Sequence, residues 1–173
     1  ATISLLKSLG KIKTPGLSVE IIVVDNGSEK KLEIEKKQNV TLISLDKNTG
    51  FTGGYNTGMK KALSQGADYV LIINNDTTVD ENLVTELQRV LDSDKNIGVV
   101  VPKIYFSKGH EFHKDKYKKE DLGKVFWYAG GFIDFANVQS IHRGVDEVDN
   151  GQYDKTEEVS FATGCCIMFK KET

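Results

Sequence analysis

Four apolar runs predict four strands in the first 106 residues, and the first three runs stop abruptly at polar residues. The run VEIIVV covers residues 19–24, and NVTLISLDKN at residues 39–48 predicts the second strand. DYVLII at residues 68–73 predicts the third strand, and IGVVVPKIYF at residues 97–106 predicts the fourth. The abrupt stops are typical of turns that leave a sheet at one edge.

Apolar residues at helical spacing alternate with these strands. One amphipathic helix is predicted over residues 2–10, closed by Gly10, and another is predicted to begin near Tyr55 and to end at Gly66. The second helix presents one apolar face, made of Tyr55, Met59, Ala62 and Leu63. A third helical stripe comprises Leu83, Val84, Leu87, Val90 and Leu91, with Thr78 and Glu81 spaced as a capping box before it. The alternation predicts an α/β fold, with a mostly parallel, Rossmann-like sheet flanked by helices on both faces.

The pattern changes after residue 106. Residues 107–123 are rich in charge and predict an exposed loop, and the lysine-rich surroundings of His110 and His113 favour solvation over a metal site. Residues 124–173 contain short strand-like runs separated by glycine turns, which predict a mixed or antiparallel C-terminal annex. The expected organisation is a single domain over residues 1–173, with a nucleotide-binding part at residues 1–106 and an acceptor-side part at residues 124–173.

Length and composition bound the class of protein. A chain of 173 residues with 39% hydrophobic content suits one core of ordinary size. Its 23 basic and 25 acidic residues give a net charge of −2, which offers no electrostatic reason to expect nucleic acid as a partner. No apolar run approaches the roughly 20 residues that a membrane-spanning helix needs, so a soluble chain without a membrane span is expected. The adjacent Cys165 and Cys166 are too close for an ordinary disulfide, and reduced thiols fit an intracellular protein.

Polar residues after the first three strands are the first candidates for a binding site. Ligands of open α/β sheets bind outside the carboxyl ends of the strands, so Asp25, Asn48 and Asp76 are expected at one rim. Two interpretations of VVDNGS stay open. Asp25 and Asn26 could bind local amides in a turn. Alternatively, the carboxylate could accept a hydrogen bond from N3–H of uracil or thymine while loop amides serve the base carbonyls.

The glycine-rich stretch GFTGGYNTGMK offers backbone amides and a helix N-terminus, which suit an anion such as a pyrophosphate. It is not a P-loop, because Met59 and Lys60 stand where a lysine and a hydroxyl residue should follow the glycines. Asn56 is expected to cap the helix, to contact the ligand, or to do both.

The stretch NND, Asn74 to Asp76, follows the third predicted strand, where a plain turn is the alternative to a binding role. Mg²⁺ or Mn²⁺ typically takes one or two protein carboxylates together with phosphate oxygens and water. Asp76 is therefore the predicted metal ligand, and Asn74 and Asn75 are interpreted as neutral hydrogen-bonding neighbours.

Four segments in sequence order resemble family 2 glycosyltransferases, particularly the rhamnosyltransferase-like branch, over nearly the whole chain. They are VVDNGS, NTGFTGGYNTGMKKA, DYVLIINND and VSFATGCCIMFKKE. The resemblance implies a GT-A fold and an inverting transfer of sugar from a nucleoside diphosphate to an acceptor hydroxyl. It assigns Asp25 to the pyrimidine base, and it assigns the cation to the last aspartate of a DxD motif, whose first carboxylate is replaced here by Asn74. It also places TGC, Thr163 to Cys165, beside the sugar and acceptor, with a buried strand after a glycine turn as the alternative.

The predicted nucleotide-binding set is Asp25, Asn26, Gly27, Ser28, Asn48, Gly53, Gly54, Asn56, Asn74 and Asn75. Asp76 is assigned to Mg²⁺ or Mn²⁺, and Thr163, Gly164 and Cys165 are assigned to the acceptor side. The expected partners are a UDP- or dTDP-linked sugar donor and a saccharide or lipid-linked acceptor, in the synthesis of cell-surface polysaccharide. The expected location is the cytoplasm, with the inner face of the membrane as the alternative for the full-length protein.

Two features of the resembling family fall outside this sequence. The family's first strand would precede Ala1, and its catalytic aspartate would follow Thr173, so the chain is expected to bind donor nucleotide with little or no transfer. Two other functions stay open. A sugar-nucleotide nucleotidyltransferase would use a similar sheet and cation, although the sequence lacks its glycine-rich basic loop. A non-catalytic nucleotide- or carbohydrate-binding module would need only the binding rim.

Overall fold

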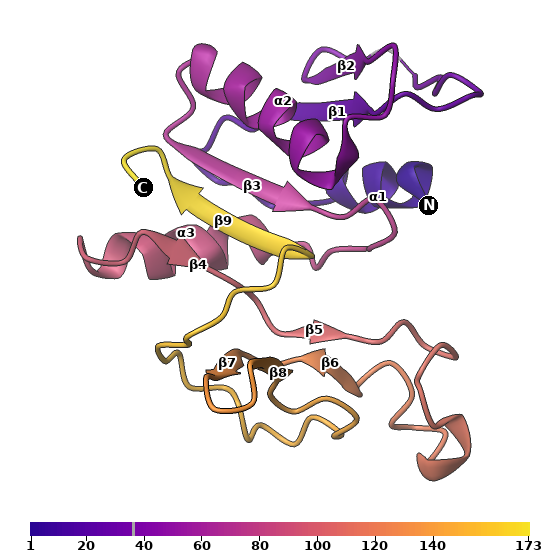
Figure 1. The fold of residues 1–173 in the computed structure, drawn as a ribbon, viewed down its shortest axis with the longest axis vertical. Helices are drawn as coiled ribbons and strands as arrows, with labels where there is room; N and C mark the ends of the chain where they lie inside the picture. The colour runs from indigo at the N-terminus through magenta and orange to yellow at the C-terminus, as the bar shows by residue number, and fades with distance from the viewer. Residues whose placement is uncertain (36) are drawn as a thin grey trace. The chain divides into compact units, whose positions relative to one another are not determined.

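The computed structural model describes residues 1–35 and 37–173, which form two compact units (Figure 1). The first unit comprises Ala1–Val100 and Met168–Thr173, and the second comprises Val101–Ile167. Both ends of the chain therefore belong to the first unit, which also contains the three predicted strand ends.

A parallel pair of strands begins the sheet structure of the first unit. β1 (Ile21–Asp25) pairs with β2 (Val40–Ser44), and the register places Asp25 opposite Ser44. Because the strands are parallel, both carboxyl ends lie at the same edge. The prediction of parallel pairing is confirmed for these two strands.

The other strands of the first unit form a three-stranded sheet in the order β3-β9-β4 (Figure 1). β3 is Tyr69–Ile73, β4 is Val99–Val100 and β9 is Cys166–Lys170, and β9 runs antiparallel to β4. The predicted fourth strand at residues 97–106 is wrong as a single parallel strand. It is divided around Pro102 into β4 and β5 (Ile104–Tyr105), and proline lacks the N–H that a continuous ladder needs. The antiparallel C-terminal annex is confirmed for β9.

The described residues of the first unit form three α-helices: α1 (Thr2–Leu9), α2 (Gly50–Ser64) and α3 (Leu83–Ser93). α2 packs on β1 and β3, as Figure 1 shows. α3 buries part of its predicted stripe, and its Leu87 and Leu91 form a core cluster with Met168 of β9. No helix in the described part of the chain is long and apolar enough to cross a bilayer.

Two predictions about helix boundaries are wrong. α2 begins at Gly50 rather than near Tyr55, so the glycine-rich stretch is helical from its first turn. The capping box before α3 does not form, because the helix begins at Leu83 and both Thr78 and Glu81 precede its N-cap, Asn82. The end of α2 is as predicted, since Gly66 follows it in a left-handed conformation with φ of +84°.

The second unit is built from short antiparallel strands. β5 pairs with β6 (Phe126–Tyr128), and β7 (Gly131–Asp134) forms a hairpin with β8 (Gln139–His142). Its core contains Val125, Phe126 and Tyr128, which are fully buried. The Tyr128 hydroxyl donates to the Phe161 carbonyl at 2.6 Å, so the buried phenol has a partner.

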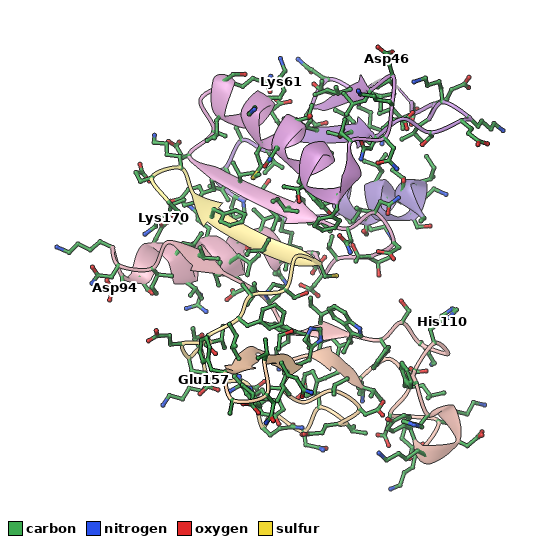
Figure 2. All side chains as sticks on the ribbon, viewed as in Figure 1. Asp46, Lys61, Asp94, His110, Glu157 and Lys170 are labelled. Carbon is green, nitrogen blue, oxygen red and sulfur yellow. The ribbon has the colours of Figure 1, made fainter. Side chains whose placement is uncertain are left out.

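Residues 107–123 are largely exposed, and Figure 2 labels His110 in this segment. A short 3₁₀ helix spans Lys114–Lys116. The segment also contains one buried carboxylate, because Glu111 accepts the Gly109 and Gly123 N–H groups at 2.8 and 2.6 Å. His113 binds the Asp146 carboxylate, and the described residues contain no cluster of three potential metal ligands.

Candidate functional site

Asp25 ends β1, and its carboxylate organises the loop that follows. The side chain is buried, with Oδ1 accepting the Ser28 N–H at 3.2 Å and Oδ2 accepting the Leu32 N–H at 3.0 Å. The Leu32 amide, and after it the Ser28 hydroxyl, lower the pKa of Asp25 below its ordinary value. The carboxylate is therefore ionised at neutral pH and fixed in place. The turn interpretation of VVDNGS is confirmed, and a base contact would have to use the lone pairs that remain.

The next residue, Asn26, joins three segments through four hydrogen bonds. Its Nδ2 donates to the Gly50 carbonyl at 2.9 Å and to Asn48 Oδ1 at 3.2 Å. Its Oδ1 accepts the Thr49 N–H at 3.0 Å and the Thr49 hydroxyl at 2.8 Å. We call this set of contacts among Asn26, Asn48, Thr49 and Gly50 the Asn26 clasp. The clasp holds the end of β1 against the start of α2.

Two predicted glycines allow this close approach. Gly27 has a φ of +77°, and a Cβ atom there would lie 2.3 Å from the Lys47 carbonyl carbon and 2.4 Å from the Asn48 nitrogen. Gly54 is buried, and a Cβ atom there would lie 3.2 Å from Asn26 Nδ2. The two glycines therefore make room for backbone and for the Asn26 side chain.

The N-terminus of α2 presents its amides at this rim. An α-helix leaves its first N–H groups without intrahelical partners, and here those of Thr49 and Gly50 are accepted by Asn26 and Asn48. Helix geometry leaves the N–H groups of Phe51 and Thr52, both in exposed residues, at the positive end of the helix. Such a terminus suits an anion.

The earlier start of α2 changes the parts assigned to its other residues. Gly53 and Gly54 follow the free amides, and the N–H of Gly54 falls within the intrahelical ladder. Asn56 is exposed in the second turn, so its predicted capping role is wrong. Thr49 precedes the helix instead, with Asn48 accepting the Gly50 N–H at 2.8 Å.

The NND residues take three different positions after β3. Asn74 is half-buried, and its Oδ1 accepts a hydrogen bond from the Tyr55 hydroxyl at 2.6 Å. Asn75 donates from Nδ2 to the Thr2 hydroxyl at 3.1 Å, which ties the turn to α1. Asp76 is exposed. The three side chains are not equivalent, and only Asp76 offers a solvent-facing carboxylate.

A divalent cation fits this site only in part. The described residues contain no group of three His, Cys, Asp or Glu side chains that could enclose a metal. A single exposed carboxylate fits a cation that takes its other ligands from phosphate oxygens and water, which is common for Mg²⁺. Asp76 thus suits a cation brought with a diphosphate.

Thr163, Gly164 and Cys165 belong to the second unit, whereas the other predicted site residues belong to the first. Thr163 is buried, and its hydroxyl accepts the Cys165 N–H at 3.3 Å in the turn before β9. Burial, followed by the neighbouring Cys165, raises the pKa of Cys166 to about 12. The segment is therefore a turn before a strand, in which Thr163 is buried, Gly164 is exposed and Cys165 is partly exposed.

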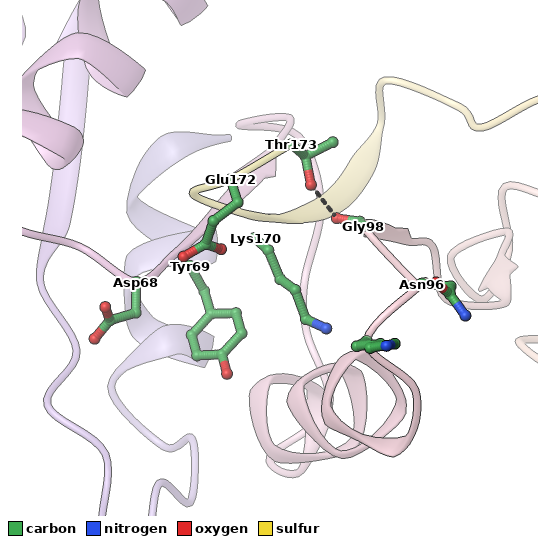
Figure 3. Close-up of a pocket in the computed structure, with 8 residues that line it drawn as sticks. Asp68, Tyr69, Asn96, Gly98, Lys170, Glu172 and Thr173 are labelled. Carbon is green, nitrogen blue, oxygen red and sulfur yellow. Dashed lines mark hydrogen bonds between the residues drawn. The ribbon is translucent and has the colours of Figure 1, made fainter.

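Figure 3 shows a pocket of about 640 Å³ in the first unit. The pocket lies at the start of β3, whereas Asn74 follows the other end of that strand. It is lined by Asp68 and Tyr69, where β3 begins, and by residues near Gly98 and Thr173. The Thr173 hydroxyl donates to the Gly98 carbonyl at 2.9 Å, as Figure 3 shows. This pocket is therefore separate from the predicted rim.

Sequence reasoning missed several residues that shape the rim. Thr49, Phe51, Thr52 and Tyr55 contribute the cap, the free amides and the contact to Asn74. The signal for the cap was present in Asn48-Thr49-Gly50, because an asparagine two residues before an amide forms an Asx turn. The contact between Tyr55 and Asn74 has no local signal.

Comparison with known proteins gives one finding. The family model described as Glycosyl transferase family 2 matches residues 3–173, which include the rim residues of the first unit and the whole second unit. A search of curated proteins found no match.

Proposed function

The chain belongs to glycosyl transferase family 2, and we propose that it binds the diphosphate of a nucleoside-diphosphate sugar at the N-terminus of α2. The family indicates a glycosyltransferase with a GT-A α/β fold, a nucleotide-sugar donor and an acceptor. The donor would lie along the carboxyl ends of β1, β2 and β3. This placement agrees with the rule for ligands of open α/β sheets.

One observation carries the proposal: the Asn26 clasp fixes the start of α2 beside the end of β1. It satisfies the Thr49 amide from within the protein and leaves the Phe51 and Thr52 amides for a ligand. Because the clasp consists of hydrogen bonds within the protein, it fixes the direction of these amides. Fixed dipoles aimed at an anion contribute more than flexible ones, since they need no reorganisation when charge develops.

We assign the pyrimidine base to the loop that Asp25 organises. The ionised carboxylate has both oxygens held by backbone amides, and each oxygen retains a lone pair that can accept N3–H of uracil or thymine. Asn26, Gly27 and Ser28 complete this part of the proposal, with Asn48 at the junction to α2. Adenine and cytosine carry no ring N–H at the equivalent position.

The diphosphate gains negative charge as its bond to the sugar breaks. The Phe51 and Thr52 amides would bind that charge, and Gly53 and Gly54 would leave room for Thr49 and Asn26, which hold the start of α2. We assign Asp76 to hold Mg²⁺ or Mn²⁺, which supplies neutralising positive charge when bound. Asn56 is exposed in the next turn and remains a proposed contact to the donor.

The identity of the sugar rests on the resemblance of four segments to the rhamnosyltransferase-like branch. We propose rhamnose, carried by dTDP or UDP, and a saccharide or lipid-linked acceptor in cell-surface polysaccharide synthesis. Thr163, Gly164 and Cys165 are proposed for the acceptor side. Nucleotide binding does not depend on these assignments, because they concern the sugar and the acceptor.

Calorimetric titration of UDP and dTDP, with Mn²⁺ or with EDTA, tests the proposed function. Wild-type protein should bind a pyrimidine nucleoside diphosphate in preference to ADP and more tightly with Mn²⁺. Asp76→Ala should remove the gain from Mn²⁺. Asp94→Ala removes the same charge near the end of α3 and should leave that gain intact. Absence of UDP and dTDP binding under both conditions would refute the proposal.

A further inference from the structure

Tyr55 and Asn74 are joined by a hydrogen bond that crosses from α2 to the end of β3. The Tyr55 hydroxyl donates to Asn74 Oδ1 at 2.6 Å, and this contact is partly buried. The Thr77 hydroxyl donates to the Asn74 carbonyl at 2.8 Å, so backbone and side chain of Asn74 are both held. The Phe51 ring packs edge-on against Tyr55, with ring centroids 4.5 Å apart. Asn74 therefore occupies a fixed position beside the rim.

An asparagine side chain has one accepting end and one donating end. At Asn74 the accepting end is turned to the Tyr55 hydroxyl, which leaves the two N–H bonds of Nδ2 as the end that can meet a ligand. Within residues 1–35 and 37–173, Asn74 Nδ2 forms no hydrogen bond to a protein acceptor. A carboxylate at the same position would present only oxygens and a negative charge. In this orientation, the Asn74 side chain can bind a ligand atom that accepts a hydrogen bond.

We propose that Asn74 donates a hydrogen bond from Nδ2 to an oxygen of the donor's diphosphate, and that Tyr55 is the positioning residue that fixes this orientation. The inference rests on the proposed function, because it needs the diphosphate at the rim. A diphosphate oxygen is favoured over a neutral acceptor because hydrogen bonds to charged groups are the stronger ones.

This arrangement has a consequence for cation dependence. A carboxylate beside a diphosphate repels it unless a cation lies between them, whereas an amide donor attracts it directly. In the NND sequence, Asn74 therefore replaces a potential metal ligand with a group that donates a hydrogen bond to an anion. Asp76 remains the sole carboxylate of the three, and nucleotide binding should persist in part when the cation is removed.

The inference is tested by titrating UDP into wild-type protein, Asn74→Asp, Asn74→Ala and Tyr55→Phe, with EDTA or with Mn²⁺. Asn74→Asp should weaken binding in EDTA by about tenfold or more, because it replaces a charge-assisted hydrogen bond with repulsion. Mn²⁺ should recover most of that loss. Tyr55→Phe should weaken binding in EDTA by about fivefold, the usual effect of one hydrogen bond.

A double-mutant cycle separates positioning from general destabilisation. Tyr55→Phe should have no further effect on binding in the Asn74→Ala background, because Tyr55 acts through Asn74. Tyr69→Phe is the matched control. It removes a tyrosine hydroxyl at the other end of β3, where Tyr69 donates a hydrogen bond to the Asp92 carboxylate at 2.6 Å. It should leave UDP binding unchanged. Circular dichroism melting of each variant identifies any that fail to fold, and Asn74→Asp tests the inference independently of Tyr55.

The outcomes distinguish this inference from the proposed function. Wild-type protein that binds no UDP even with Mn²⁺ refutes the proposed function together with the inference. Wild-type protein that binds UDP only with Mn²⁺, or Asn74→Asp binding equally well in EDTA, overturns the inference alone. Titration of dUDP, which lacks the ribose 2′-hydroxyl, identifies the ligand atom. If Asn74→Ala weakens the binding of UDP and dUDP equally, the contact is to the diphosphate, as we propose. If Asn74→Ala weakens the binding of UDP but not of dUDP, the contact is to the 2′-hydroxyl and the inference is overturned.

Discussion

Asn26 Nδ2 lies 3.2 Å from Asn48 Oδ1, in a hydrogen bond between residues that are 22 positions apart in the sequence. Asn26 follows β1, and Asn48 lies between β2 and α2. The bond thus connects the carboxyl ends of two parallel strands. Through it, a residue of the first loop determines where a later helix begins.

Replacing Asn26 with alanine should destabilise the protein and loosen the start of α2. Four hydrogen bonds are lost, but the site is partly exposed, so the expected cost is about 2 kcal/mol rather than the sum of four. Urea denaturation measures this cost. Asn39→Ala removes one hydrogen bond to the Val19 carbonyl and should cost roughly half as much. Equal costs would show that the clasp contributes no more than a single hydrogen bond.

Gly27→Ala should be far more damaging than Gly16→Ala. Both glycines have a φ of +77°, so both substitutions carry the left-handed penalty of about 1–2 kcal/mol. A Cβ at Gly16 meets nothing within 4 Å, whereas one at Gly27 would collide with the backbone of Lys47 and Asn48. The difference in thermal midpoint between the two variants measures the destabilisation caused by the collision alone. Similar midpoints would contradict the close approach.

Asp25 should contribute to the acid sensitivity of the fold. Its folded pKa is lowered from 3.8, first by the Leu32 amide. The stabilisation is therefore present above the unfolded pKa and is lost as the pH falls through the folded pKa. Asp25→Asn should lower the urea midpoint at pH 7, and the gap from wild type should narrow below about pH 4. A gap independent of pH would contradict a role for the ionised carboxylate.

The matched control for this experiment is Asp46→Asn. Asp46 is an exposed carboxylate in the same unit, labelled in Figure 2. Its substitution should leave the urea midpoint at pH 7 close to that of wild type. A comparable loss in this variant would show that net charge, rather than the loop hydrogen bonds, explains the result for Asp25.

The two adjacent cysteines should react at different rates with iodoacetamide. Cys165 is partly exposed, whereas Cys166 is buried with a pKa raised to about 12 by that burial. Because the thiolate is the reactive form, Cys165 should be alkylated first at pH 8. Peptide mass spectrometry locates the modification, and protein unfolded in urea should lose the preference. Equal labelling of the native protein would contradict the burial of Cys166.

The rim was predictable because its signal is local. Apolar runs that stop at Asp25 and Asn74 mark strand ends, and the alternation of strands with helices places such ends at one edge. The start of α2 was not predictable from its own residues. Glycine disfavours a helix, yet the side chains of Asn26 and Asn48 bind the first amides and offset that preference.

Nonlocal pairing also limited the prediction of the sheet. β9 lies between β3 and β4, and nothing in the sequence of either strand identifies that neighbour. The charged segment at residues 107–123 also contains a pairing that the sequence does not predict. Glu111 is buried there because two backbone amides satisfy its carboxylate, a pairing that the composition of the loop does not signal.

We expect a nucleoside diphosphate to bind at the rim formed by the Asn26 clasp and the start of α2. The most direct test is a ¹H–¹⁵N NMR titration of the protein with UDP and dTDP in the presence of Mg²⁺. Binding at this rim should give saturable shifts of the Gly27, Thr49, Phe51 and Thr52 amides, without shifts around the separate pocket near Gly98. Shifts confined to that pocket, or none at the start of α2, would contradict it.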